Sequence, residues 1–145
     1  MRIRQSFCYP CFQRDGLGLD ALCRAAAEIG YAGVEGWFRG EDFDELVAAA
    51  GSHGLAIPSM CGHQSLTDGL NKRANHDRIE AELRASIDLA ERLGIGGLIC
   101  FSGNRNDGQD DADALEATAE GLRRVAPHAE KAGVNLNVEL LNSKV

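Results

Sequence analysis

The chain of 145 residues has no run of lysine and arginine, and its formal net charge is -7. Proteins that bind nucleic acid or anionic membranes through electrostatics need a basic patch, so the sequence argues against such partners. A small metabolite is the better expectation. No apolar stretch approaches the roughly 20 residues that cross a bilayer, and the first residues lack the apolar segment of a secretory signal. We therefore expect a cytoplasmic protein.

Three common functional motifs are also missing. The sequence has no GxGxxG fingerprint, no lysine-containing phosphate loop and no GxSxG elbow. These motifs position a dinucleotide, a nucleoside triphosphate and a nucleophilic serine, respectively. Dinucleotide binding, phosphoryl transfer and serine-based hydrolysis therefore have no support in the sequence.

The cysteines are few and odd in number, which fits reduced thiols better than a disulfide framework. The five are Cys8, Cys11, Cys23, Cys61 and Cys100. Cys8 and Cys11 form a single CxxC motif, for which a redox or zinc role is conceivable. There is no second CxxC, and no helix obviously begins there to lower a thiol pKa. The favoured interpretation is two thiols near a strand end.

Apolar runs of strand length alternate with amphipathic segments of helix length, which is typical of βα units on a parallel sheet. The strand-like segments cover residues 3–9, 33–38, 56–61, 97–101 and 134–141, and the helix-like segments cover residues 19–29, 43–53, 74–93 and 112–131. Gly30, Gly54, Gly94 and Gly133 stand where helix-ending glycines belong. We expect Pro127 to kink or interrupt the last helix.

The fifth strand-like segment decides between two α/β architectures. Leu136, Val138 and Leu140 alternate with Asn137 and Glu139, so one face is apolar and the other is polar. In an open doubly wound sheet, both faces would more often be apolar. We predict a partial TIM barrel, with four βα units and a fifth parallel strand forming one domain over residues 1–145. The rival is a doubly wound domain with strand order 2-1-3-4-5.

The ligand site of a parallel α/β fold lies at the carboxyl ends of its strands, so the following segments hold the candidate site residues. The segments after the third and fourth strands are roughly ten residues long, longer than the usual four to six. His63 follows the third strand, where an imidazole could bind substrate oxygen, ligate metal or shuttle a proton. The alternative is a surface or capping histidine. Trp37 lies at the carboxyl end of the second strand-like segment and could stack on a substrate or pack in the core.

Glu35 and Glu139 are acidic residues within apolar strand-like runs. A carboxylate buried in this way needs a metal, hydrogen bonds or a cation to offset the cost. Such a group suits hard-metal binding or proton abstraction next to a carbonyl. We favour function for Glu139. For Glu35, a structural bond to a neighbouring strand or helix is an equal alternative.

The sequence resembles the hydroxypyruvate isomerase family of xylose-isomerase-like TIM barrels, over the whole chain. The segments that carry the resemblance are IRQSFCYPCF, GYAGVEGW, SMCGHQSLTDGLN, ICFSGNR and RVAPHAEKAGVNLNVELLNSKV, of which the last is the most specific. The resemblance implies an isomerase that acts through an enediolate with one divalent metal, Mg or Mn. It places Glu139 on the first metal-binding and proton-transferring glutamate, and brings His63 and Asn142 to the substrate.

In that family, further metal ligands come from the sixth, seventh and eighth strands, which have no counterpart here. One carboxylate would hold a metal weakly, so residues 1–145 alone are expected to be inactive. The leading hypothesis is the N-terminal part of an enzyme that interconverts hydroxypyruvate and tartronate semialdehyde. The alternatives are another sugar isomerase or epimerase, or a non-catalytic half-barrel that self-associates through its open edge.

Overall fold

The computed structural model describes residues 3–139 and residue 141 of the chain. Its elements alternate as predicted: β1 (Ser6–Cys8), the 3-10 helix η1 (Tyr9–Cys11), α1 (Leu19–Ile29), β2 (Gly33–Glu35), α2 (Phe43–Ser52), β3 (Ser59–Cys61), the 3-10 helix η2 (Arg73–Asn75), α3 (His76–Leu93), β4 (Gly97–Phe101), α4 (Asp111–Ala132) and β5 (Asn135–Glu139). They form two compact units, residues 1–61 and 62–145. That residues 1–145 form one domain stays a prediction.

Helices α1, α3 and α4 end at the predicted glycines, because glycine adopts the left-handed backbone conformation that closes a helix at little cost. Helix α2 ends at Ser52 with His53 as its C-cap, one residue before Gly54. Gly30 caps α1 with φ 104°, and its N–H donates to carbonyls of the last turn. Gly94 and Gly133 cap α3 and α4, each with φ 68°. Within the described residues, no helix combines the length and apolar character that crossing a bilayer requires.

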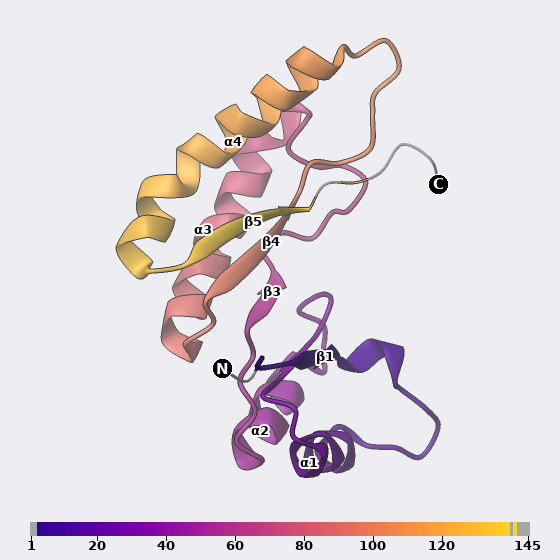
Figure 1. Cartoon of the computed structure of the whole chain (residues 1–145). Helices are drawn as coiled ribbons and strands as arrows, with labels where there is room; N and C mark the ends of the chain where they lie inside the picture. The colour runs from indigo at the N-terminus through magenta and orange to yellow at the C-terminus, as the bar shows by residue number, and fades with distance from the viewer. Residues whose placement is uncertain (1–2, 140, 142–145) are drawn as a thin grey trace. The chain divides into compact units, whose positions relative to one another are not determined.

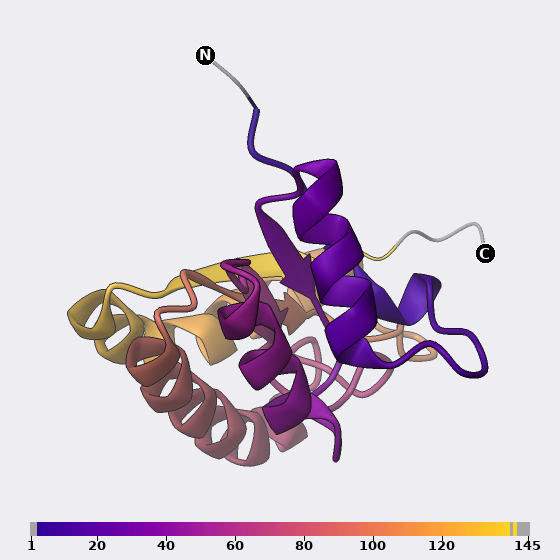
Figure 2. The same ribbon diagram turned by 90° about the horizontal axis from the view of Figure 1, so that it is seen from below.

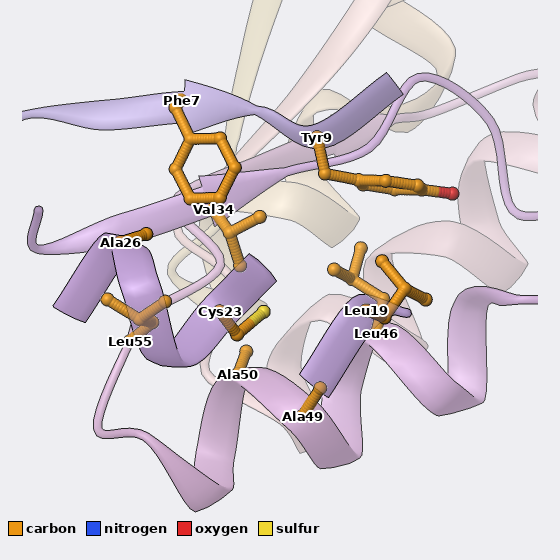
Figure 3. Close-up of a cluster of buried hydrophobic side chains, with 10 residues drawn as sticks. All are labelled: Phe7, Tyr9, Leu19, Cys23, Ala26, Val34, Leu46, Ala49, Ala50 and Leu55. Carbon is orange, nitrogen blue, oxygen red and sulfur yellow. The ribbon is translucent and has the colours of Figure 1, made fainter. Parts of the chain in front are cut away.

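The first unit is a small parallel sheet covered on one face by α1 and α2, as Figure 2 shows. Strands β1 and β2 pair in parallel, with Phe7 opposite Val34. These two side chains point toward the helices and are buried in the apolar cluster drawn in Figure 3. The cluster consists of Phe7, Tyr9, Leu19, Cys23, Ala26, Val34, Leu46, Ala49, Ala50 and Leu55.

The strand order in this unit rules out the doubly wound rival. Gly33 at the start of β2 forms a parallel bridge with Ala56, in the segment that leads into β3. Strand β2 therefore lies between β1 and the approach to β3. In the order 2-1-3-4-5, β1 would occupy that central place. The order of consecutive neighbours is the one that a barrel requires.

The first strands are shorter than predicted. Strand β1 was expected over residues 3–9, but it pairs only from Ser6 to Cys8. The chain turns immediately afterwards into η1, and Pro10 within that turn has no N–H to offer a neighbouring strand. A strand's length therefore depends on where its neighbour can pair, which the apolar run alone does not specify.

The second unit packs α3 and α4 along one face of β4 and β5, as Figure 1 shows. The two strands are parallel, with Leu98 opposite Leu136 and Phe101 opposite Glu139. Leu98 is fully buried, together with the α3 stripe that the periodicity predicted, Ile79, Leu83, Ile87 and Ala90. Because side chains alternate along a strand, Glu139 lies on the face opposite Leu136. The predicted polar face of the fifth strand is confirmed.

Helix α4 continues through Pro127, so its predicted interruption is wrong. Proline cannot donate to the carbonyl four residues earlier, and its ring crowds that turn of the helix. Arg84 of α3 donates a guanidinium N–H to the backbone carbonyl of Arg124 at 3.1 Å. This bond ties α4 to α3 near Pro127, but the carbonyl that Pro127 leaves without its helical donor is that of Arg123, four residues earlier.

Candidate functional site

The last residue of β5, Glu139, lies at the carboxyl end of the strand, opposite Phe101 of β4. Its side chain is exposed to solvent, like that of Asn137 on the same face. The sequence suggested a carboxylate enclosed by apolar residues, and the structure corrects this. In the described chain Glu139 is a solvated carboxylate on the polar face of the sheet, in the place where parallel α/β proteins bind ligands.

His63 meets the same point of the sheet from the loop that follows β3. Its Nε2 accepts the backbone N–H of Phe101 at 2.9 Å. The two rings also lie edge to face, with centroids 5.4 Å apart. His63 is only 1% exposed, so the alternative of a surface histidine is wrong. Phe101 thus connects His63, which bonds to its backbone, with Glu139, which lies opposite it in the sheet.

The hydrogen bond from Phe101 also fixes which nitrogen of His63 carries the proton. A neutral imidazole that accepts at Nε2 must carry its hydrogen on Nδ1. That Nδ1 is buried and has no hydrogen-bond partner among the residues the structure describes. Burial lowers the pKa of His63, Arg78 lowers it further, and Glu82 opposes both. At neutral pH, His63 is therefore uncharged, and its unpaired Nδ1–H donor is enclosed in the described chain.

The burial of His63 predicts that the fold loses stability in mild acid. The unfolded chain takes up a proton near the ordinary histidine pKa of 6.5, whereas the folded chain resists it. Stability contributed by neutral His63 is therefore present above pH 6.5 and is lost below it, at up to about 1.4 kcal/mol per pH unit. Urea unfolding at pH 7.5 and 5.5 measures the change. His63→Gln should show a smaller loss, and an equal loss would contradict the prediction.

The loops after β3 and β4 hold this region rigid by pairing with each other. Leu70 and Asn71 donate their backbone N–H groups to the carbonyls of Phe101 and Ser102, at 3.1 and 2.7 Å. The N–H of Asn104 donates in turn to the carbonyl of Thr67 at 2.9 Å. Long loops were expected to build or cover a site. These two loops are joined to each other by backbone hydrogen bonds just beyond the end of β4.

Asn71 is a polar residue of this region that the sequence did not single out. It is 4% exposed, and its side-chain amide donates to the carbonyl of Asn104 at 2.7 Å. Its Oδ1 is buried without a hydrogen-bond partner in the described part of the chain. An asparagine in a long polar loop gives no local signal of burial, because the contact that buries it comes from a loop 33 residues away.

A groove of about 580 Å³ lies on the other face of β5, beside α4. Its polar end includes Asn71 and Arg105, and its apolar wall includes Leu115, Val138 and Leu141. Val138 and Glu139 are consecutive in the strand and so point to opposite faces. The groove is therefore separate from the polar face that carries Glu139.

Two further candidates, Trp37 and Glu35, belong to the first unit. Trp37 is 56% exposed, so the alternative that it packs in the core is wrong. Its role in stacking on a substrate stays a prediction. Asn142 lies outside the described residues. Glu35 accepts hydrogen bonds from Ser6 of β1 and, at 2.6 Å, from Ser59 of β3. These are hydrogen bonds to neighbouring strands, as the structural alternative for Glu35 predicted.

The described residues do not make a complete metal site. Among residues 3–139 and 141, no group of three or more histidine, cysteine, aspartate or glutamate side chains could hold a metal ion. Magnesium requires near-octahedral oxygen coordination, to which one carboxylate contributes only a small part. Glu139 could therefore act only as one ligand among several.

The comparison with known protein families agrees with this architecture. The family described as "Xylose isomerase-like TIM barrel" matches residues 23–145. The chain belongs to this family. As a xylose isomerase-like TIM barrel chain, it has the parallel strands and alternating helices of that fold, and within each unit consecutive strands are neighbours.

Relatives of this xylose isomerase-like chain include enzymes named for different substrates. A Streptomyces coelicolor protein named "Putative hydroxypyruvate isomerase" is 27% identical over 132 residues, covering 81% of this chain and 47% of that protein. The structure is similar to an AP endonuclease, family 2, from Brucella melitensis, with TM-score 0.77, 21% identity and coverage of 97% and 56%. D-Psicose 3-epimerase from Clostridium cellulolyticum H10 gives TM-score 0.72, 18% identity and coverage of 97% and 53%. The chain spans about half the length of these relatives.

Proposed function

We propose that the whole protein is a metal-dependent isomerase that converts hydroxypyruvate into tartronate semialdehyde through an enediolate. The observation that carries the proposal is that His63 and Glu139 are both neighbours of Phe101. His63 bonds to its backbone N–H, and Glu139 lies opposite it at the carboxyl end of the strand pair. The Streptomyces coelicolor relative supports the choice of substrate.

Within this proposal, Glu139 moves a proton between two carbon atoms. Its carboxylate removes a proton from the hydroxymethyl carbon of hydroxypyruvate, next to the ketone, and returns a proton to the former carbonyl carbon. Charge accumulates on the ketone oxygen during the first step. The unpaired Nδ1–H of His63 is suited to donate to a substrate oxygen, because the neutral ring adds no charge of its own.

The metal belongs to the proposal for the whole protein. A bound divalent ion would polarise the substrate carbonyl, and Glu139 is the residue of this chain that would bind it. Because the described residues supply no further cluster of ligands, we expect residues 1–145 alone to hold Mg or Mn weakly.

The test is isomerisation of hydroxypyruvate with added Mg²⁺ or Mn²⁺, measured for residues 1–145 and for the protein at the full length of its relatives. We expect turnover by the longer protein and none above background by residues 1–145. Equal turnover by both would contradict a metal site that needs ligands from outside residues 1–145 in addition to Glu139. Epimerisation of ketoses without turnover of hydroxypyruvate would favour another sugar isomerase or epimerase, for which the similarity to D-psicose 3-epimerase gives a reason.

A non-catalytic assembly role is the second candidate, and the exposed apolar residues beside β5 favour it. Leu115 is 72% exposed, and Val138 and Leu141 are also exposed along the same groove. The proposed occupant is a second copy of the chain, because β5 could pair with its own equivalent while both grooves are covered. Sedimentation of residues 1–145 should then give the mass of a dimer, and Leu115→Lys should shift it to a monomer. A monomeric wild-type chain at high concentration would exclude this role.

A further inference from the structure

Cys8 and Cys11 flank a tight turn at the end of β1. Cys8 is the N-cap of the 3-10 helix η1, and Cys11 is its last residue, with Pro10 between them. Residues three apart in a 3-10 helix lie nearly above one another, and a rise of about 2 Å per residue separates them by about 6 Å. Disulfides join Cα atoms about 4.4–6.8 Å apart. The turn therefore presents the two cysteines at a separation that a disulfide can span.

Besides burial, two neighbouring side chains affect the pKa of Cys8: that of Cys11 raises it and that of Trp37 lowers it, so both lie close to Cys8. Cys11 is exposed and Cys8 is half-buried, whereas Cys23, Cys61 and Cys100 are buried. All five carry free thiols. A reagent in solution thus reaches Cys11 first and meets Cys8 beside it.

We propose that Cys8 and Cys11 are a reversible dithiol–disulfide pair that exchanges with small-molecule disulfides. The Cys11 thiolate attacks one sulfur of the small disulfide, forms a mixed disulfide and expels one small thiolate. Cys8 then loses its proton and attacks the sulfur of Cys11, which closes the protein disulfide and expels the second small thiolate. The protein loses two hydrogens and two electrons, and the small disulfide gains them as two thiols.

The surroundings of the pair assign the two steps to different cysteines. Burial, the neighbouring Cys11 and the carboxylate of Glu35 raise the pKa of Cys8 to about 11. At neutral pH, Cys8 therefore remains a thiol and is a poor first attacker. Its closing attack is intramolecular, and the short turn keeps its sulfur next to that of Cys11. This order makes the exposed Cys11 the entry point and Cys8 the resolving group.

The test is a redox titration of the whole chain in mixtures of reduced and oxidised glutathione, followed by alkylation and mass spectrometry of the peptide with residues 8–11. We expect this peptide to lose two hydrogens as the oxidised fraction rises, and dithiothreitol to reverse the loss. Cys11→Ser should abolish it. Cys23→Ala should titrate as the wild type does, because Cys23 is buried in the apolar core and alanine adds no polar group there. Alkylation of both cysteines at every ratio, or a stable glutathione adduct on Cys11 without closure, would overturn the proposal.

Trp37 provides a second readout, since it is the single tryptophan of the chain and lies close enough to Cys8 to affect its pKa. Formation of the disulfide should change its fluorescence with the same midpoint as the change in mass. The change should be absent in Cys11→Ser, in which a serine at an exposed position leaves the core untouched. A fluorescence change that persists in this variant would show that oxidation acts elsewhere and would contradict the assignment.

Discussion

Replacing Gly69 by alanine is expected to lower the free energy of unfolding by about 3 kcal/mol, since steric overpacking against backbone is not easily relieved. A Cβ at position 69 would lie 2.5 Å from both the backbone N of Gly103 and the carbonyl oxygen of Phe101. These are backbone atoms, so no side chain can move aside. The two loops would have to separate, and the hydrogen bonds between residues 67–71 and 101–104 would be strained or lost.

Gly96→Ala is the matched control for this prediction. Gly96 lies in the same unit, just before β4, and a Cβ there would meet nothing within 4 Å. Urea unfolding should therefore leave Gly96→Ala near the wild type and move Gly69→Ala to a much lower midpoint. Hydrogen exchange at the amides of Leu70 and Asn71 should also accelerate in Gly69→Ala. Equal stability of the two variants would show that the loops are not held by this close contact.

The contact of Gly69 with Gly103 also shows what the sequence could and could not reveal. The helices were predicted from local signals, namely an apolar stripe with a period of 3.6 residues and a glycine after the last turn. Gly30, Gly94 and Gly133 confirm those ends. The meeting of two glycines from loops 34 positions apart has no local signature. A glycine in a polar loop is expected at an ordinary turn as well as at a close backbone contact, so the residue type alone does not distinguish the two.

The ends of the strands were the weakest part of the fold prediction for a related reason. An apolar run indicates that a segment is buried, but pairing depends on the neighbouring strand. Residues 3–9 read as a strand, yet only Ser6–Cys8 pair before the chain turns at Pro10. The predicted interruption at Pro127 was wrong for another reason, since a helix can continue past a proline when the rest of its turns are hydrogen-bonded, as α4 does over Asp111–Ala132.

In the candidate site, too, the local pattern predicted one feature and missed those that depend on tertiary contacts. The alternation in β5 correctly placed Glu139 on the polar face of its strand, because side-chain direction follows from the strand period alone. The burial of His63 and its bond to Phe101 could not be foreseen, since both depend on how the loop after β3 folds back onto β4. The sequence therefore indicated the residue types of the site, and tertiary contacts determined their environment.

Replacing Glu139 by glutamine is expected to reduce isomerisation by the full-length protein about 10²–10⁴-fold, which is the usual contribution of a proton-transferring group. Glutamine keeps the size and shape of the side chain but has no negative charge to accept a proton or bind a cation. The position is exposed at the end of β5, so stability should change by less than about 0.5 kcal/mol. Rates of hydroxypyruvate turnover and urea unfolding, measured on the same preparation, separate the two effects.

Glu130→Gln provides the control for this change of charge. Glu130 is an exposed residue of α4, on the helix layer instead of the polar strand face, so the same substitution should leave turnover unaltered. A parallel loss of activity in both variants would point to a general electrostatic effect of net charge. Full activity of Glu139→Gln with added Mg²⁺ or Mn²⁺ would remove Glu139 from the chemistry. The meeting of His63 with the β4–β5 edge at Phe101 would then have to serve another ligand.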